Sequence, residues 1–416
     1  MGSKLSGEKR INVFCREPHY EIAVFIMFFT AYLFTVPNLQ NLNEYTAVYY
    51  VLTYADFGFK SRLVMGSIIG LFTNYITRKA IYIIISIFTI FFIGIVSFLV
   101  GDIVRRISKN IGNSAEIFII LFVACPVSIQ YLFNINNFGR FDLFSILITT
   151  VILFCIKNEK TKWLVPFLCV FAVIFNYNFV FMYMPVIAII MIYEYLVNHN
   201  SRTHFMIFAV SCLAVAGFFI YFKVFAPESG FSSQEKLKIF LAGKTDIQGG
   251  EIPVFGDFCF PLAGIYMRDA GKSYSWFFDL LKVYGPFMFF STVPAFAVLI
   301  SFWIKALKDA QQKTKKFVFL LCLFAPIAGL PMFLAIDWDR WIPTLFISQF
   351  MLVLYILARN DERAVDALKS IVSYFNRHSL LFTVLIIYSA SSIFSNNYSV
   401  YVSVMLQHID NFLSFA

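Results

Sequence analysis

The chain has 416 residues, of which 60% are hydrophobic and 14% charged, and its mean hydropathy is +0.76. Average globular domains carry about 25% charged residues, so this composition excludes a soluble protein of ordinary type and indicates a polytopic membrane protein. The net charge of +9 is typical of basic cytoplasmic loops, and no basic run has the density of a nucleic-acid-binding patch, so nucleic acid is not expected as a partner.

Apolar runs long enough, or nearly so, to cross a bilayer recur along the whole chain, since a crossing helix needs about 20 residues. They lie at 20–37, 80–100, 116–133, 141–156, 163–176, 178–195, 205–223, 276–304, 317–334, 341–357 and 379–395. We interpret the first run as a signal anchor, because the stretch before it is too long and mixed for the start of a cleaved signal peptide. The sequence predicts one all-α transmembrane domain over 1–416, with about 11 spanning helices.

One further apolar segment, 62–76, is ambiguous because it is short and has basic residues at both ends. If it does not cross and the N-terminus is cytoplasmic, the later basic clusters fall on the inner side, as the positive-inside rule requires. These clusters are "RRISK" (105–109), "KNEKTK" (157–162), "KALKDAQQKTKK" (305–316) and the segment with Arg359, Arg363, Lys369 and Arg377. Residues 38–79 then form a first outer loop with two juxtamembrane helices, at about 44–55 and 62–76.

The same assignment of inner and outer sides places three other connections outside and one inside. The outer ones are the short loop 134–142, the long loop 224–275 and the stretch "DWDRW" (337–341). Inside, residues 360–378 predict an Asp-capped amphipathic helix whose apolar stripe faces the inner leaflet. That stripe consists of Val365, Leu368, Ile371, Val372 and Phe375.

Charged residues stand in three of these outer segments. Asp56 and Arg62 belong to "YADFGFKSRLVMG", in which Gly58 and Gly66 are expected to allow a tight turn and close helix packing. Arg140 and Asp142 stand in "NNFGRFD", where a spanning helix begins. A helix-dipole role for Asp142 and a headgroup contact for Arg140 are the plain alternatives.

The third segment, "DWDRW", places Asp337, Asp339, Arg340 and Trp341 in a very short connection between two apolar runs. Asp337, Arg340 and Trp341 share a face in any helical turn, and a charge at bilayer depth costs at least about 2.5–3.5 kcal/mol unless it is paired or hydrated. An interfacial tryptophan belt explains the aromatic residues but not two carboxylates.

If the three segments converge, they form an acid–base group beside a phosphate clamp. A carboxylate can take a proton from a sugar hydroxyl, and a guanidinium can hold a phosphate through two hydrogen bonds and stabilise charge that develops on it. We therefore expect Arg340 to face a lipid-borne phosphate, with Asp337 or Asp339 orienting it.

At these residues the chain resembles the GT-C-type membrane glycosyltransferases, which use polyprenyl-phosphate-linked sugars. The resemblance lies in an acidic residue among juxtamembrane helices (Asp56), a second one at a helix start ("GRFD", Asp142), a long later outer loop and a basic residue near the outer surface (Arg340). It implies an inverting transferase with a lipid-linked sugar donor and a glycan or lipid-linked acceptor. Asp56 would be the general base and Asp142 would position the acceptor or assist it. Arg340, with Arg62 or Arg140, would grip the donor phosphate.

Two other functions stay open, namely an oligosaccharide polymerase or ligase and a lipid-linked glycan flippase or transporter. "GRFD" and "DWDRW" also resemble membrane proteins of bacterial surface-polysaccharide clusters, which implies a bacterial cytoplasmic membrane. The seven cysteines form no CxxC and no Cys/His cluster, so neither a disulfide framework nor a structural metal site is expected. If a divalent ion binds Asp56 and Asp142, an oxygen-only Mg²⁺ or Mn²⁺ site is the expected form.

Overall fold

The computed structural model describes most of the chain between residues 19 and 391. The ranges outside the description within that span are 112–115, 117–121, 123–124, 126–127, 135–136, 198–201, 226–238, 248–291 and 335–337. Every element among the described residues is a helix and none is a strand, so the predicted all-α class is confirmed for this part.

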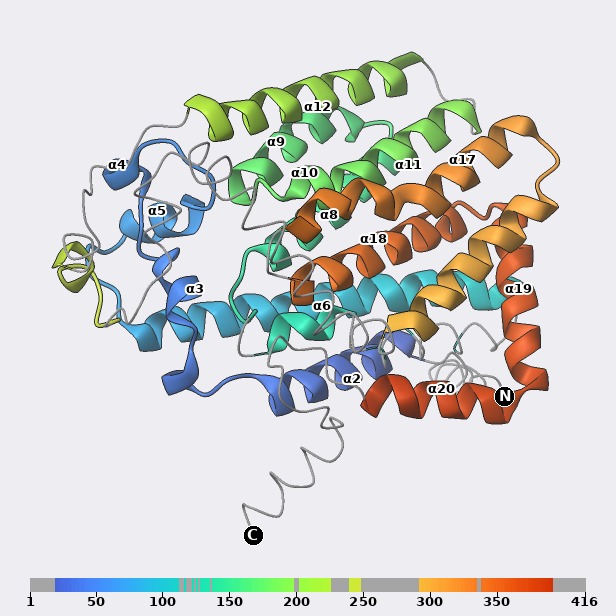
Figure 1. The fold of residues 1–416 in the computed structure, drawn as a ribbon, viewed down its shortest axis with the longest axis horizontal. Coiled ribbons are helices and arrows are strands. Elements are labelled where there is room, and N and C mark those ends of the chain that lie inside the picture. Colours follow the sequence, from blue (N-terminus) through green and yellow to red (C-terminus); the bar gives the residue numbers. More distant parts are fainter. Residues whose placement is uncertain are drawn as a thin grey trace, which may run out of the picture.

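Most of the longer helices run side by side along the longest axis of the molecule (Figure 1). They are α2 (Tyr20–Thr35), α6 (Arg78–Ile111), α8 (Asp142–Lys157), α9 (Val165–Phe175), α11 (Met184–Leu196), α12 (Arg202–Ile220), α17 (Lys313–Phe324), α18 (Trp338–Ala358) and a helix at 292–309. The short helices α3 (Glu44–Val48), α4 (Tyr54–Phe57) and α5 (Val64–Gly70) lie at one end of this bundle, and α19 (Glu362–Arg377) crosses the other end. We name these the α3 end and the α19 end.

Four described helices are long and apolar enough to cross a membrane: Arg78–Lys109, Arg202–Phe225, Lys313–Met332 and Arg340–Ala358. A fifth is added if α19 and α20 (Ser379–Ser391), which meet at a bend of 98°, are counted as one span. The predicted number of about 11 is not confirmed. Several predicted spans are shorter helices, with 16 residues in α2 and in α8, 11 in α9 and 13 in α11. The run 116–133 and part of 276–304 lie largely outside the described residues.

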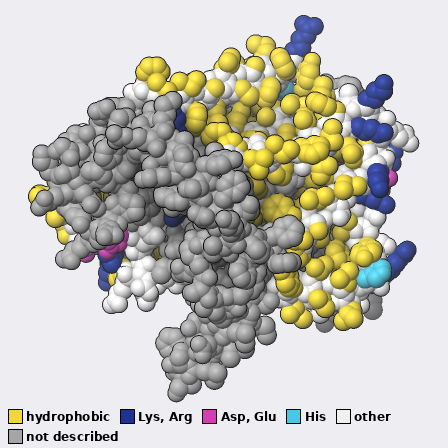
Figure 2. Space-filling view, in the orientation of Figure 1, with side chains coloured by type: hydrophobic (Ala, Val, Ile, Leu, Met, Phe, Trp, Pro, Cys, Tyr) yellow, Lys and Arg dark blue, Asp and Glu magenta, His cyan; other side chains and the backbone are white. Residues whose placement is uncertain are grey.

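Apolar side chains fill the bundle and also cover much of its outer surface. Phe28, Phe92, Phe302 and Trp303 are fully buried, which is the packing expected of a bundle core. Figure 2 shows apolar side chains spread across the visible face, with most of the visible Lys and Arg side chains along the edge at the α19 end. This charge asymmetry is expected of a membrane protein whose α19 end is cytoplasmic.

Helix α19 begins where the sequence predicts it. The side chain of Asp361 caps it by accepting hydrogen bonds from the backbone N–H groups of Arg363 and Ala364, at 3.0 and 3.3 Å. The expected contact of its apolar stripe with lipid is wrong, because most of the stripe is buried inside the protein. The buried members are Val365, Leu368, Val372 and Phe375.

Buried ion pairs hold the α19 end together. Glu194 of α11 is fully buried and accepts hydrogen bonds from Tyr355 at 2.8 Å and from Arg359 at 2.6 Å. Asp361 accepts a hydrogen bond from Lys315 of α17 at 2.8 Å. Helices α11, α17, α18 and α19 are therefore joined by charges that cannot separate without leaving a buried ion unpaired.

The first outer loop differs from its prediction. Three short helices, α3, α4 and α5, replace the two helices expected at 44–55 and 62–76. The two glycines act as expected: Gly58 ends α4 with a positive φ of 71°, and Gly66 lies so close to Leu52 that a Cβ would come within 2.0 Å of its carbonyl oxygen.

Replacing Gly66 by Ala is expected to destabilise the α3 end by roughly 1–3 kcal/mol, because the new methyl group must displace backbone. Gly94 of α6 is the matched control, since a Cβ there meets no atom within 4 Å and Gly to Ala in a helix is stabilising by up to about 1 kcal/mol. Thermal unfolding of the two purified variants checks this, and equal stability of both would contradict the close approach.

Candidate substrate-binding site

A buried ion pair joins α8 to α18 beneath the α3 end. Arg340 donates to Asp142 through Nε at 2.8 Å and through Nη2 at 2.9 Å, which is the two-point geometry of a strong Arg–carboxylate pair. The Asp142 side chain is fully buried and Arg340 is 4% exposed. Asn176, directly after α9, donates a third hydrogen bond to Asp142 at 3.1 Å. Both carboxylate oxygens are therefore engaged in holding Arg340.

Arg340 reaches the surface in a small cavity that we name the arginine pocket. It is lined by Arg62, Arg140 and Arg340, together with Thr46, Tyr49, Gly139, Phe141 and Asn176. Its volume of about 20 Å³ is room for about one water molecule, so a phosphate group would enter it with a single oxygen atom. The Thr46 hydroxyl is buried and has no hydrogen-bond partner among the described residues. A cavity whose described lining has three arginines and no carboxylate is suited to an anion.

Arg62 reaches this pocket from a strained backbone. It is one of two described non-glycine residues with positive φ, at 75°, a conformation that costs on the order of 1–3 kcal/mol and is most often kept at functional sites. Its backbone N–H donates to Ile174 at the end of α9 at 3.0 Å. Its guanidinium lies 4.9 Å from the ring centre of Tyr177 and 5.7 Å from that of Tyr49, within the range of cation–π attraction.

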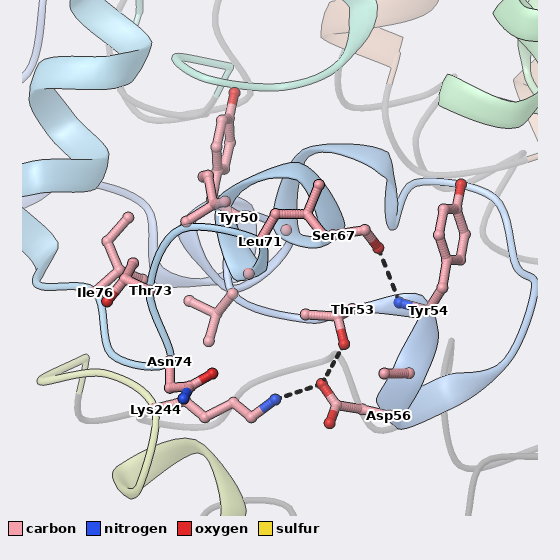
Figure 3. Close-up of a pocket in the computed structure, with 15 residues that line it drawn as sticks. Tyr50, Thr53, Tyr54, Asp56, Ser67, Leu71, Thr73, Asn74, Ile76 and Lys244 are labelled. Atoms are coloured by element: carbon pink, nitrogen blue, oxygen red, sulfur yellow. Dashed lines mark hydrogen bonds and ion pairs between the residues drawn. The ribbon is translucent and has the colours of Figure 1, made fainter.

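A second and larger cavity, of about 440 Å³, contains Asp56 and lies among α4, α5 and the residues that follow them (Figure 3). The Asp56 Oδ2 atom accepts a hydrogen bond from Thr53 at 2.7 Å and forms an ion pair with Lys244. Burial raises the pKa of the Tyr54 hydroxyl, which belongs to another lining residue, to about 12. That hydroxyl therefore stays protonated at neutral pH.

Lys244 is held in place because residues 239–247 of the long loop dock onto the first outer loop. The backbone carbonyl of Lys244 accepts from Ile76 N–H at 2.9 Å. Asp246 accepts from the backbone N–H of Arg78, at the start of α6, and the rings of Phe57 and Phe240 meet edge to face at 6.0 Å between centres. The long loop thus supplies one wall of the Asp56 cavity.

Consecutive tyrosines separate the two cavities. Tyr49 lines the arginine pocket and Tyr50 lines the Asp56 cavity. The Tyr50 hydroxyl donates to the carbonyl of Gly139 at 2.8 Å, which ties this partition to the loop that carries Arg140. The structure therefore brings Arg62, Arg140, Asp142 and Arg340 together, while Asp56 lies in the neighbouring cavity.

The remaining residues of "DWDRW" are described only in part. Asp337 lies outside the described residues, and Asp339 is in α18 but its side chain is also outside the description. Trp341 is buried, and its ring lies 4.7 Å from the guanidinium carbon of Arg340. It supports Arg340 rather than lining either cavity as the structure describes them.

Sequence reasoning missed Asn176, Lys244 and Thr46. Asn176 had a usable signal, because it interrupts an apolar run and a buried amide needs a polar partner. Lys244 had none, since it stands in a long loop of mixed charge.

Among the described residues no group of three His, Cys, Asp or Glu could hold a metal ion. Of the pair considered for Mg²⁺ or Mn²⁺, Asp56 lines the larger cavity, whereas Asp142 is fully buried in its pair with Arg340.

Comparison of the chain with known proteins adds no assignment: no family model matches it, and no curated protein or solved structure matches it significantly. Inferences about function therefore rest on the geometry of the two cavities.

Proposed function

We propose that this chain is an integral membrane glycosyltransferase, which transfers a sugar from a polyprenyl-phosphate-type lipid donor to a glycan or lipid-linked acceptor at the outer face of a bacterial cytoplasmic membrane. The observation that carries the proposal is the arginine pocket. Guanidinium groups from three distant segments meet there, at one end of an apolar helical bundle and beside a cavity with a carboxylate.

The arginines suit the leaving group of such a reaction. When the bond between the sugar C1 and the phosphate oxygen breaks, the bonding electron pair stays with that oxygen and the phosphate gains a negative charge. Arg62, Arg140 and Arg340 then bind the transition state more strongly than the donor, which is the condition for catalysis. Asp142 positions Arg340, since both of its oxygens are already occupied.

The acceptor hydroxyl attacks C1 from the side opposite the phosphate, so the configuration at C1 inverts. Its oxygen forms the new bond to C1, and its proton passes to a carboxylate. Asp56 is our candidate for this base, because it is only 17% exposed and lines a cavity large enough for a sugar. Tyr49 and Tyr50, adjacent in the chain, line the arginine pocket and the Asp56 cavity, and this supports pairing Asp56 with the arginines.

Replacing Asp56 by Asn is expected to lower the transfer of labelled sugar from a polyprenyl-phosphate donor by about 10²–10⁴-fold, the usual contribution of a positioned base. Glu44→Gln is the matched control, because Glu44 is a carboxylate of the same loop that pairs with Arg78. Its transfer rate should stay close to that of the wild type.

Unchanged turnover in a folded Asp56→Asn variant would remove Asp56 from the mechanism. Product analysis in cells that lack the protein separates the proposal from its main rival. A shortened or undecorated glycan unit fits a sugar transferase, whereas accumulation of complete single repeat units would identify a polymerase or ligase instead.

A further inference from the structure

The Asp56 cavity has the size and the lining of a small-ligand site. Its volume of about 440 Å³ lies within the range of about 300–1,000 Å³ that is usual for such pockets. Asn74 contributes an amide to the lining that also holds the Asp56–Lys244 ion pair (Figure 3). The Thr53 and Ser67 hydroxyls donate to Asp56 and to the backbone carbonyl of Leu63, so they hold the lining in place. A ligand here meets a carboxylate, an ammonium group and an amide, and a sugar hydroxyl both donates and accepts hydrogen bonds.

The charge of this cavity differs from that of the arginine pocket. Asp56 and Lys244 neutralise one another, and their side chains are 17% and 25% exposed, so both can be reached by a ligand. The described lining of the arginine pocket contains three arginines and no carboxylate. A phosphate is therefore attracted to the arginine pocket. The Asp56 cavity has no net charge to attract a phosphate, so it favours an uncharged polar ligand.

Two tyrosines complete the lining. The Tyr54 hydroxyl stays protonated because burial raises its pKa to about 12, and it has no hydrogen-bond partner among the described residues. Tyr50 is buried, and its hydroxyl is already committed to Gly139. That hydroxyl is itself buried, so Tyr54 forms part of the wall without offering the ligand a donor, and Tyr50 fixes the wall toward the arginines.

We infer that the Asp56 cavity is a binding site for an uncharged saccharide. Asp56 accepts hydrogen bonds from the sugar hydroxyls, and Lys244 of the long loop donates to them. That this sugar is the acceptor rests on the proposed function, but the binding itself does not. Lys244 is then a specificity-determining residue, since it cancels the charge that would otherwise select a cationic ligand.

Cysteine protection tests the site without requiring turnover. Asn74 is exposed and lines the cavity, so Asn74→Cys in a background with Cys15 and Cys259 changed to Ser offers a thiol for N-ethylmaleimide in nanodiscs. The described native cysteines are buried or half-buried. A neutral hexose or N-acetylhexosamine at about ten times its Kd should slow labelling about tenfold, as mass action requires. A uronic acid and inorganic phosphate should protect far less.

Two variants of similar shape change the charge preference in opposite directions. Asp56→Asn leaves Lys244 unpaired, so protection should shift toward the uronic acid, and Lys244→Gln should weaken uronic acid binding further. Thermal unfolding of each variant shows that the fold is kept. The inference is overturned if no neutral sugar protects the introduced thiol of the Asn74→Cys protein, if phosphate protects as well as sugar, or if the Asp56→Asn variant keeps the wild-type preference.

The outcome is separable from that of the proposed function. Loss of sugar protection with intact transfer from the lipid donor would contradict only the saccharide site. Intact protection without any transfer would contradict only the proposed transferase activity.

Discussion

Replacing Asp142 by Asn is expected to destabilise the folded protein by about 3–5 kcal/mol, the usual cost of breaking a buried ion pair from one side. Asp142 is fully buried and holds Arg340 through two hydrogen bonds of 2.8 and 2.9 Å. An amide of the same shape cannot neutralise the guanidinium, which would remain buried and charged. Thermal and denaturant unfolding of the purified protein in nanodiscs measure the loss.

A double variant separates stability from function. Changing Asp142 to Leu and Arg340 to Met removes both charges, and such apolar replacements of a buried pair are often neutral or stabilising. The stability of the double variant should therefore recover, whereas its binding of a polyprenyl phosphate should be lost because Arg340 is absent. If the single Asp142→Asn variant unfolds within about 0.5 kcal/mol of the wild type, as ordinary surface substitutions do, the pair does not have the burial described.

The second large effect concerns the rim of the arginine pocket. Replacing Arg62 or Arg140 by Gln is expected to lower kcat/KM for the lipid donor by about 10²–10³-fold each, as removal of one group that stabilises developing charge does elsewhere. Lys at either position should recover part of the loss, because it keeps the charge but not the two-point geometry of the guanidinium. Both residues line the cavity. The rate of sugar transfer from a labelled donor measures the effect.

Arg106→Gln is the control for a general effect of lost positive charge. Arg106 pairs with Asp102 on α6 and is 57% exposed, near the opposite end of that helix from Arg78. Its variant should transfer sugar at close to the wild-type rate. Equal losses in the Arg106 and Arg140 variants would show that bulk electrostatics, rather than contact with the donor phosphate, causes the effect.

Strong local patterns allowed much of the helical architecture to be predicted. The long apolar run at 80–100 became α6, and Asp361 caps α19 because its carboxylate satisfies free backbone N–H groups. The number of spans was not predictable in this way. Hydropathy does not reveal that α9 has only 11 residues, or that the amide of Asn176, directly after it, donates to Asp142.

The sequence predicts which residues form the candidate site better than it predicts how they are arranged. Arg62, Arg140 and Arg340 are predicted because each is a charge in an outer segment between apolar runs, and they line one cavity. Nothing local shows that Asp142 is saturated by Arg340, or that Lys244 crosses from the long loop to Asp56. Both contacts join residues far apart in sequence, and single-sequence patterns hold no information about such pairing.

Helix α6 also shows where the arginine pocket lies along the bundle. Its 34 residues span about 51 Å, more than the roughly 30 Å of a hydrocarbon core, so its charged final turns must emerge from the bilayer. Gly139, in the loop of the arginine pocket, packs on Ile85 of this helix, roughly 10 Å from the helix start at Arg78. If the chain is the proposed transferase, a lipid phosphate near that end of the helix reaches the guanidinium groups by lateral diffusion within its own leaflet. Extraction of the isoprenoid tail is then unnecessary, and the rate of encounter is governed by two-dimensional diffusion.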